Sequence, residues 1–328
     1  MPAHYDQQDR DGYTVLMLAA MLCLEGAVKA LVAGGASLDV QDAHGCTALM
    51  RAVECCDDAS VKALVAGSAS LDLQNSHGST ALMLAAERRD SATVKVLVVA
   101  GASLDLRDGY GSTALMWAAE HVNDATVKVL VAAGASLDLQ DNDGSTALLW
   151  AASAKFHATA KALVAAGASL DLRDNHERTA LLWAARRGND ATAKALVAAG
   201  VSLDLQDDDG RTALMWAAEC CDDATVEALV VGGASLDTRD SDGCTALMLS
   251  TTCNHVILDF AQKFEPAQRT RAFRALRAGH RARLVKRALD QRLSPDMIQE
   301  VIKGLPAWWW LQQQPRQLTS DSSDWDDY

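Results

Sequence analysis

The sequence is poor in aromatic residues, in proline and in long apolar runs. Aromatic residues make up 5% of the 328 positions, and five residues are proline. No run of 18 or more apolar residues occurs, so we expect no transmembrane segment. The first twelve residues are polar and acidic, unlike a secretory signal. We therefore expect a cytoplasmic or nuclear protein whose eight cysteines are free thiols.

The motifs of catalysis and cofactor binding are also missing. The sequence contains no Gly-rich phosphate loop and no nucleophile elbow. The pairs Cys55-Cys56 and Cys220-Cys221 lie far apart, and no histidine stands at the spacing of a zinc site. Most aspartates occupy turns, where local hydrogen bonds account for them. We expect no catalytic residues, no metal site, no cofactor and no small-molecule substrate.

Positive charge is scarce except in one segment. The formal net charge is −13, yet residues 262–303 hold eleven Lys and Arg against four Asp and Glu. Residues 304–328 are acidic again, with a net charge of −3, which leaves −17 on residues 1–261. A surface of that sign repels phosphates, so nucleic acid is not an expected ligand of residues 1–261.

Two phrases recur along the chain at an interval of 33 residues, and such a repeat takes precedence over other fold indications. The first contains a threonine, and the second, GASLD or a near copy, keeps the same phase. Eight copies, the last of them partial, cover roughly residues 9–260. The threonines are Thr14, Thr47, Thr80, Thr113, Thr146, Thr179, Thr212 and Thr245.

One copy is expected to form two helices and an extended finger. Residues 179–185, TALLWAA, place apolar residues at helical spacing behind Thr179, a good N-cap. A polar break follows, and we expect Asp190 to cap a second helix that Gly200 ends. The next residues run extended and turn at an Asp-Gly pair. Neither helix is long enough to be stable alone, so stacked copies must share a core.

These phrases resemble the ankyrin repeat. The family's T-P-L-H-x-A-A stands here as T-A-L-M-W-A-A, and its G-A-D-V-N as G-A-S-L-D. Met or Leu replaces the His that, in the family, hydrogen-bonds to the Thr. The resemblance implies an all-α ankyrin-repeat solenoid, and the pattern of the residues after it predicts a helical C-terminal tail. The expected parts are an N-terminal extension at 1–8, an array of about seven full repeats and one partial repeat at 9–265, a basic helical tail at 266–310 and a disordered acidic end at 311–328.

The resemblance also implies a non-catalytic protein that binds another protein. Partners of the family dock on the fingertips and on the exposed side of the first helix with its following turn. Four arginines fall in these places in adjoining repeats, and such a basic spot suits an acidic segment of a protein partner. The expected partner-binding residues are Tyr110, His121, Phe156, His176, Arg178, Arg186, Arg187 and Arg211. The alternative is that these residues are only solvated.

Two other features have alternative interpretations. Four tryptophans recur at the 33-residue interval, and we interpret them as inter-helix core rather than as a stacking platform for bases. They are Trp117, Trp150, Trp183 and Trp216. In the first repeat, Met21, Leu22 and Leu24 replace the polar turn. They are expected to form an exposed apolar patch or to be covered by the N-terminal residues.

The tail offers a second candidate function. Residues 267–292 are expected to form a basic helix that folds back on the acidic array, or that binds an acidic protein, an anionic membrane or nucleic acid. Residues 293–305 resemble the opening of an F-box, with Ser294 where that motif has Pro; they also fit a plain capped helix. In the first case the chain is a substrate-recognition adaptor of a ubiquitin ligase. The adaptor helix would use Leu293, Asp296, Ile298, Val301, Ile302 and Leu305.

Overall fold

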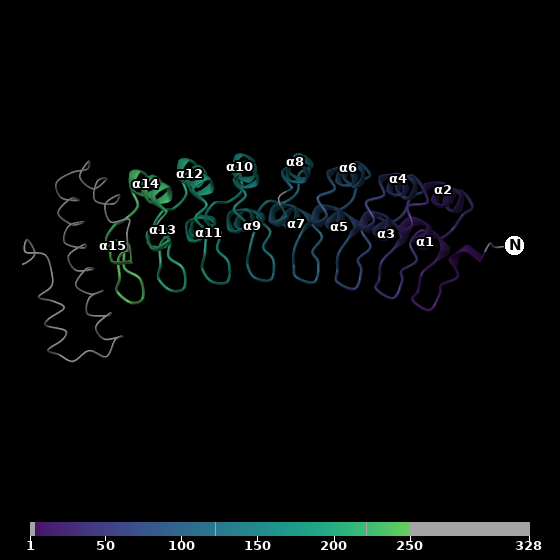
Figure 1. Cartoon of the computed structure of the whole chain (residues 1–328), viewed down its shortest axis with the longest axis horizontal. Coiled ribbons are helices and arrows are strands. Elements are labelled where there is room, and N and C mark those ends of the chain that lie inside the picture. Colours follow the sequence, from purple (N-terminus) through teal and green to yellow (C-terminus); the bar gives the residue numbers. More distant parts are fainter. Residues whose placement is uncertain (1–3, 122, 221, 250–328) are drawn as a thin grey trace, which may run out of the picture.

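The computed structural model describes residues 4–249 except 122 and 221. Within them the chain forms a gently arched row of helix pairs with a finger projecting from each pair, and it contains no strand (Figure 1). The first helices, which adjoin the fingers, are α1 (Val15–Met21), α3 (Ala48–Glu54), α5 (Ala81–Glu87), α7 (Ala114–Glu120), α9 (Ala147–Ser153), α11 (Ala180–Arg187), α13 (Ala213–Glu219) and the start of an eighth, α15 (Ala246–Leu249). The predicted all-α solenoid is confirmed.

The second helices lie along the outer side of the arch (Figure 1). They are α2 (Glu25–Ala33), α4 (Asp58–Ala66), α6 (Ser91–Val99), α8 (Asp124–Ala132), α10 (His157–Ala165), α12 (Asp190–Ala198) and α14 (Asp223–Val231). A short 3-10 helix, η1 (His4–Asp6), packs against α1. The extensive helix–helix contacts all join helices of the same repeat or of adjacent repeats, as a solenoid requires.

The threonine of the repeated phrase caps the first helix of every full repeat. Its Oγ1 accepts a hydrogen bond from the backbone N–H three residues later, at 3.3 to 3.4 Å. In four repeats the Sδ of the methionine at that position accepts in turn from the threonine N–H, at 3.4 to 3.5 Å. Methionine therefore supplies a second capping bond where the related family has histidine.

The cap of the second helix differs from the prediction. In α12, Asn189 rather than Asp190 is the N-cap, since its Oδ1 accepts from the N–H of Thr192 at 3.3 Å. Asp190 is the first helical residue, where its charge still favours the positive end of the helix. The polar break is shorter than expected because α11 continues through Arg187, and Gly188 reverses the chain with a φ of 64°.

Aspartate and serine of the GASLD phrase join each repeat to the next. The carboxylate of Asp138, for example, accepts from the backbone N–H of Ser169 at 2.9 Å and from its hydroxyl at 2.5 Å. The same pair of bonds recurs from Asp6 with Ser37 to Asp171 with Ser202. These bonds begin at Asp6, so they extend the array into residues 4–8, which the sequence alone places outside it.

The fingers also bond to one another. A backbone N–H at each fingertip donates to a carbonyl of the preceding finger at 2.8 to 3.2 Å. The turn needs a residue with positive φ and leaves no room beside it. At Gly144, with a φ of 77°, an added Cβ would lie 2.9 Å from the backbone nitrogen of Asn175. Glycine is therefore the residue expected at this place in every finger.

The first repeat exposes apolar side chains. Val15, Leu18, Leu22 and Leu24 are 40 to 66% exposed. The predicted apolar patch at this end of the array is thus uncovered in the part of the chain that the structure describes. None of the helices between residues 4 and 249 has the length and apolar character needed to cross a membrane.

Candidate functional site

Four tryptophans form a row on the first helices α7, α9, α11 and α13. Each is half-buried against the core, and its indole N–H donates to the aspartate nine residues earlier, at 2.8 to 3.0 Å. The interpretation as inter-helix core is therefore right only for the buried side of each ring. The other side belongs to the surface, at a position that the aspartate of the finger fixes.

Arginines cover two of these tryptophans. The guanidinium carbon of Arg178 lies 4.2 Å from the ring centre of Trp183, and that of Arg211 lies 4.5 Å from Trp216. Arg186 contacts both rings, at 5.6 Å from Trp183 and 4.8 Å from Trp216. A guanidinium held on an indole keeps its N–H edge available for the bidentate binding of a carboxylate.

The four arginines differ in their own ion pairs. Arg178 donates from Nε to Asp174 at 3.0 Å, and Arg211 pairs with Glu219 at 2.6 Å. Arg186 and Arg187 form no ion pair with any carboxylate of residues 4–249, positions 122 and 221 aside. Arg187 nevertheless lies 5.4 Å from the ring centre of Trp183. The exposed guanidinium groups of Arg186 and Arg187 thus lie beside Trp183, and neither pairs with a carboxylate of the described residues.

The finger that precedes α11 departs from the common pattern. Glu177 takes the place of the turn glycine and has a φ of 59°, a conformation that costs an L-residue about 1–2 kcal/mol. The adjoining fingertip bond, from Asp208 N–H to His176 O, is 3.2 Å long and is the longest in the row. The side chain of Glu177 pairs with Arg173 at 2.6 Å. Strain of this kind is often concentrated near functional sites, and here it adjoins the arginine group.

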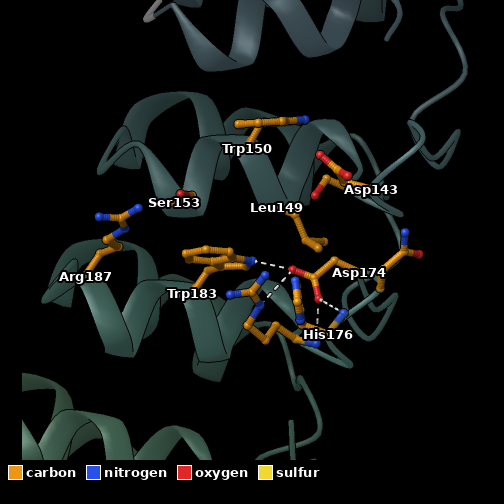
Figure 2. A pocket seen from close by; sticks show the side chains of 11 residues that line it. Asp143, Leu149, Trp150, Ser153, Asp174, His176, Trp183 and Arg187 are labelled. Carbon is orange, nitrogen blue, oxygen red and sulfur yellow. Dashed lines mark hydrogen bonds and ion pairs between the residues drawn. The ribbon is translucent and has the colours of Figure 1, made fainter. Parts of the chain in front are cut away.

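A pocket of about 280 Å³ opens between α9 and α11. Figure 2 shows Trp150 and Trp183 seen nearly edge-on above and below it, with Ser153 and Arg187 toward one end and Asp143 and His176 toward the other. The remaining lining residues are Ser145, Leu149, Asp174, Asn175 and Arg178.

Asp174 is buried in the wall of this pocket and is already saturated. Its carboxylate accepts from the backbone N–H groups of His176 and Arg178 and from Arg178 Nε, at 2.9 to 3.0 Å. The indole N–H of Trp183 adds a fourth bond at 3.0 Å. Asp174 thus positions the arginine and the tryptophan and has little capacity left for a ligand.

The structure brings together five of the eight predicted site residues. His176, Arg178 and Arg187 line the pocket. Arg186 lies over Trp183, a wall of the pocket, and over Trp216 of the next repeat, which Arg211 also covers. The other three lie elsewhere and do not line the pocket. Tyr110 is a fingertip residue that is 67% exposed, and the ring of His121 lies 5.6 Å from that of Trp117. Phe156 occupies the N-cap position of α10 without making a capping bond.

The predicted adaptor helix cannot be placed on this surface. Its residues lie outside the residues that the structure describes, as does the basic segment 267–292. The adaptor residues are Leu293, Asp296, Ile298, Val301, Ile302 and Leu305.

Cysteines and acidic clusters add no second centre in the described chain. Burial raises the pKa of the Cys46 thiol, and it also raises that of Cys55, which lies near Cys23 and Glu54. Both are therefore poor nucleophiles at neutral pH. Carboxylates of the three aspartates 207–209 approach one another at a fingertip, but Asp207 accepts from Trp216 and Asp208 lies 3.1 Å from the His176 ring.

Comparison with protein families agrees with this architecture. A family model described as ankyrin repeats in three copies matches residues 2–75, 56–141, 115–207 and 185–263. The chain belongs to the ankyrin repeat family. A search of the curated proteins finds no match. Ankyrin repeats are protein–protein interaction modules and are generally non-catalytic, so this ankyrin array is an interaction module.

Proposed function

We propose that this ankyrin protein binds an acidic segment of another protein on its Arg–Trp surface, without catalysis. The Arg–Trp surface consists of Trp183 and Trp216 with Arg178, Arg186, Arg187 and Arg211. The observation that carries the proposal is the pair Arg186 and Arg187, two guanidinium groups held beside an indole with no carboxylate partner among the described residues.

The charge of the surroundings supports this assignment. Residues 1–261 carry a net charge of −17, so a group of four arginines is a local exception on an acidic array. Two like charges on adjacent residues repel each other, and an anion that bound there would relieve that repulsion. Because the rings already restrict the guanidinium groups, less side-chain entropy is lost when a carboxylate binds.

An acidic protein segment fits better than nucleic acid. The charge of the whole array repels a long phosphate backbone, while a short acidic peptide contacts only the basic area. The family supports the same choice, because ankyrin repeats are protein–protein interaction modules.

The experiment compares two matched double charge reversals in the full-length chain. Arg186→Glu with Arg187→Glu changes the proposed surface at the end of α11. Arg88→Glu with Arg89→Glu makes the same change directly after α5, where two adjacent arginines are also exposed. Fluorescence anisotropy measures binding of a labelled peptide of Asp and Glu without aromatic residues. We expect the first variant to weaken binding by about ten-fold or more and the second to have little effect. Equal losses in both variants, or no loss in either, would contradict the proposal.

A further inference from the structure

The pocket between α9 and α11 is lined by Ser153, a small residue at a position where the other described repeats have a large one. Ser153 is the last residue of α9, and its equivalent in the next repeat is Arg186, three residues after Trp183. Among the described repeats Ser153 alone is small at this position. The others have Met21, Glu54, Glu87, Glu120, Arg186 and Glu219.

The space between the next pair of tryptophans, Trp183 and Trp216, contains an arginine side chain. Between Trp183 and Trp216 the guanidinium of Arg186 lies 5.6 Å from one ring centre and 4.8 Å from the other. Between Trp150 and Trp183 no side chain of the described residues takes that place, and the pocket of about 280 Å³ remains. The two spaces therefore both have tryptophans as walls, but the guanidinium of Arg186 lies in the second, whereas the first contains the pocket.

The two ends of the pocket carry opposite charges. Arg187 lies at the Ser153 end, and the exposed carboxylate of Asp143 lies at the opposite end (Figure 2). Neither forms an ion pair with a described residue. The other charged pair in the wall, Asp174 with Arg178, is already joined at 3.0 Å. A suitable occupant thus has a flat apolar body, a hydrogen-bond donor toward Asp143 and an anion near Arg187.

We propose that this pocket receives a tryptophan or tyrosine side chain of the acidic partner segment. The ring enters between Trp150 and Trp183, its N–H or O–H donates to Asp143, and a flanking carboxylate binds Arg187. Offset or edge-to-face packing of aromatic rings favours this arrangement. The volume of about 280 Å³ lies just below the range of about 300–1,000 Å³ for ligand pockets, which suits one side chain.

This inference rests on the proposed function and adds the residue that anchors the segment. A partner lysine or arginine is disfavoured because Arg187 would repel it, although aromatic walls alone attract cations. The acidic end of the chain itself contains two aromatic residues of the required chemistry, Trp325 between Asp324 and Asp326, and Tyr328 after Asp327. The test is therefore made in full-length chain that carries Trp325→Leu and Tyr328→Leu, so that neither ring competes for the pocket.

The test uses two labelled peptides, Asp-Asp-Trp-Asp-Asp and the same peptide with Leu in place of Trp. Ser153→Arg is the informative variant because it supplies the group that Arg186 places in the next interval, while it adds positive charge. Ser153→Ala is its matched control. Circular dichroism and thermal unfolding verify that both variants fold.

We expect the Trp peptide to bind about ten-fold more tightly than the Leu peptide in the parent chain and in Ser153→Ala. Ser153→Arg should reduce this ratio to about one by filling the pocket. A Ser153→Arg chain that keeps the preference of about ten-fold for the Trp peptide would overturn the inference, because the ring would then bind somewhere other than the filled pocket. If the Leu peptide still loses affinity in Arg186→Glu with Arg187→Glu while the ratio is near one in the parent chain, the pocket inference fails and the proposed function stands.

Discussion

Asp141 and Asp174 are equivalent buried aspartates of two neighbouring fingers. Replacing them by asparagine should lower the free energy of local unfolding by unequal amounts. In both fingers one carboxylate oxygen accepts two backbone N–H groups, and the other accepts the tryptophan N–H. Asparagine keeps the first oxygen and turns an amide N–H₂ toward the indole N–H. The loss common to Asp141→Asn and Asp174→Asn is about 1–3 kcal/mol, the usual cost of a buried donor without an acceptor.

Asp174 has one additional partner, Arg178 Nε at 3.0 Å, whose side chain is 17% exposed. A hydrogen bond to a charged group contributes about 1.5–3 kcal/mol, so Asp174→Asn should destabilise by roughly that much more than Asp141→Asn. Hydrogen exchange of the backbone N–H groups of the two fingers measures the local opening free energy directly. In an Arg178→Ala background the difference should disappear. Equal costs in the parent chain would show that Arg178 is not held by Asp174.

Three further outcomes follow from single contacts. Glu177→Gly should stabilise the chain by about 0.5–1 kcal/mol in urea unfolding, because relief of the positive φ outweighs the added freedom of glycine in the unfolded chain. A loss of stability would show that the ion pair of Glu177 with Arg173 contributes more than the strain costs. Asp138→Ala should lower the opening free energy at Ser169 by about 1 kcal/mol in hydrogen exchange, and unchanged exchange would argue against the inter-repeat bonds. Burial raises the pKa of Asp42, but the Arg51 guanidinium and two backbone N–H groups outweigh it, so the folded pKa is lowered. The resulting stability is present above the unfolded pKa of about 3.9 and is lost as pH falls through the folded value, and an acid titration of Asp42→Asn should lack that component.

The fold could be predicted because every interface between repeats needs the same residues. The threonine caps and the small alanines recur at the 33-residue interval, and each has one physical role. The helix boundary after Arg187 was missed because Gly188 lets α11 run one residue longer than the other full first helices. No local propensity distinguishes Asn189 from Asp190 as the cap.

The site could be predicted only in part. The arginines were found because they differ from their equivalents in other repeats. The 33-residue period predicted where the tryptophans lie along the row but not how their rings are oriented. The aspartate nine residues before each tryptophan could have indicated the orientation, because it accepts the indole N–H. Ser153 was missed because a small polar residue attracts no attention by itself, and it matters only where both neighbours along the row carry a large side chain. Glu177 was visible as a glycine replaced in one finger, but its strain required the backbone angles.

The most direct test of where this ankyrin array binds its partner is the NMR spectrum of its indole N–H groups. Tryptophan substitutions assign the signals in full-length chain carrying Trp325→Leu and Tyr328→Leu, and the Asp-Asp-Trp-Asp-Asp peptide is then added. The account predicts that the signals of Trp150, Trp183 and Trp216 shift. The signal of Trp117, which neither lines the pocket nor has an arginine over its ring, stays in place. An equal shift of Trp117, or no shift of Trp183, would contradict it.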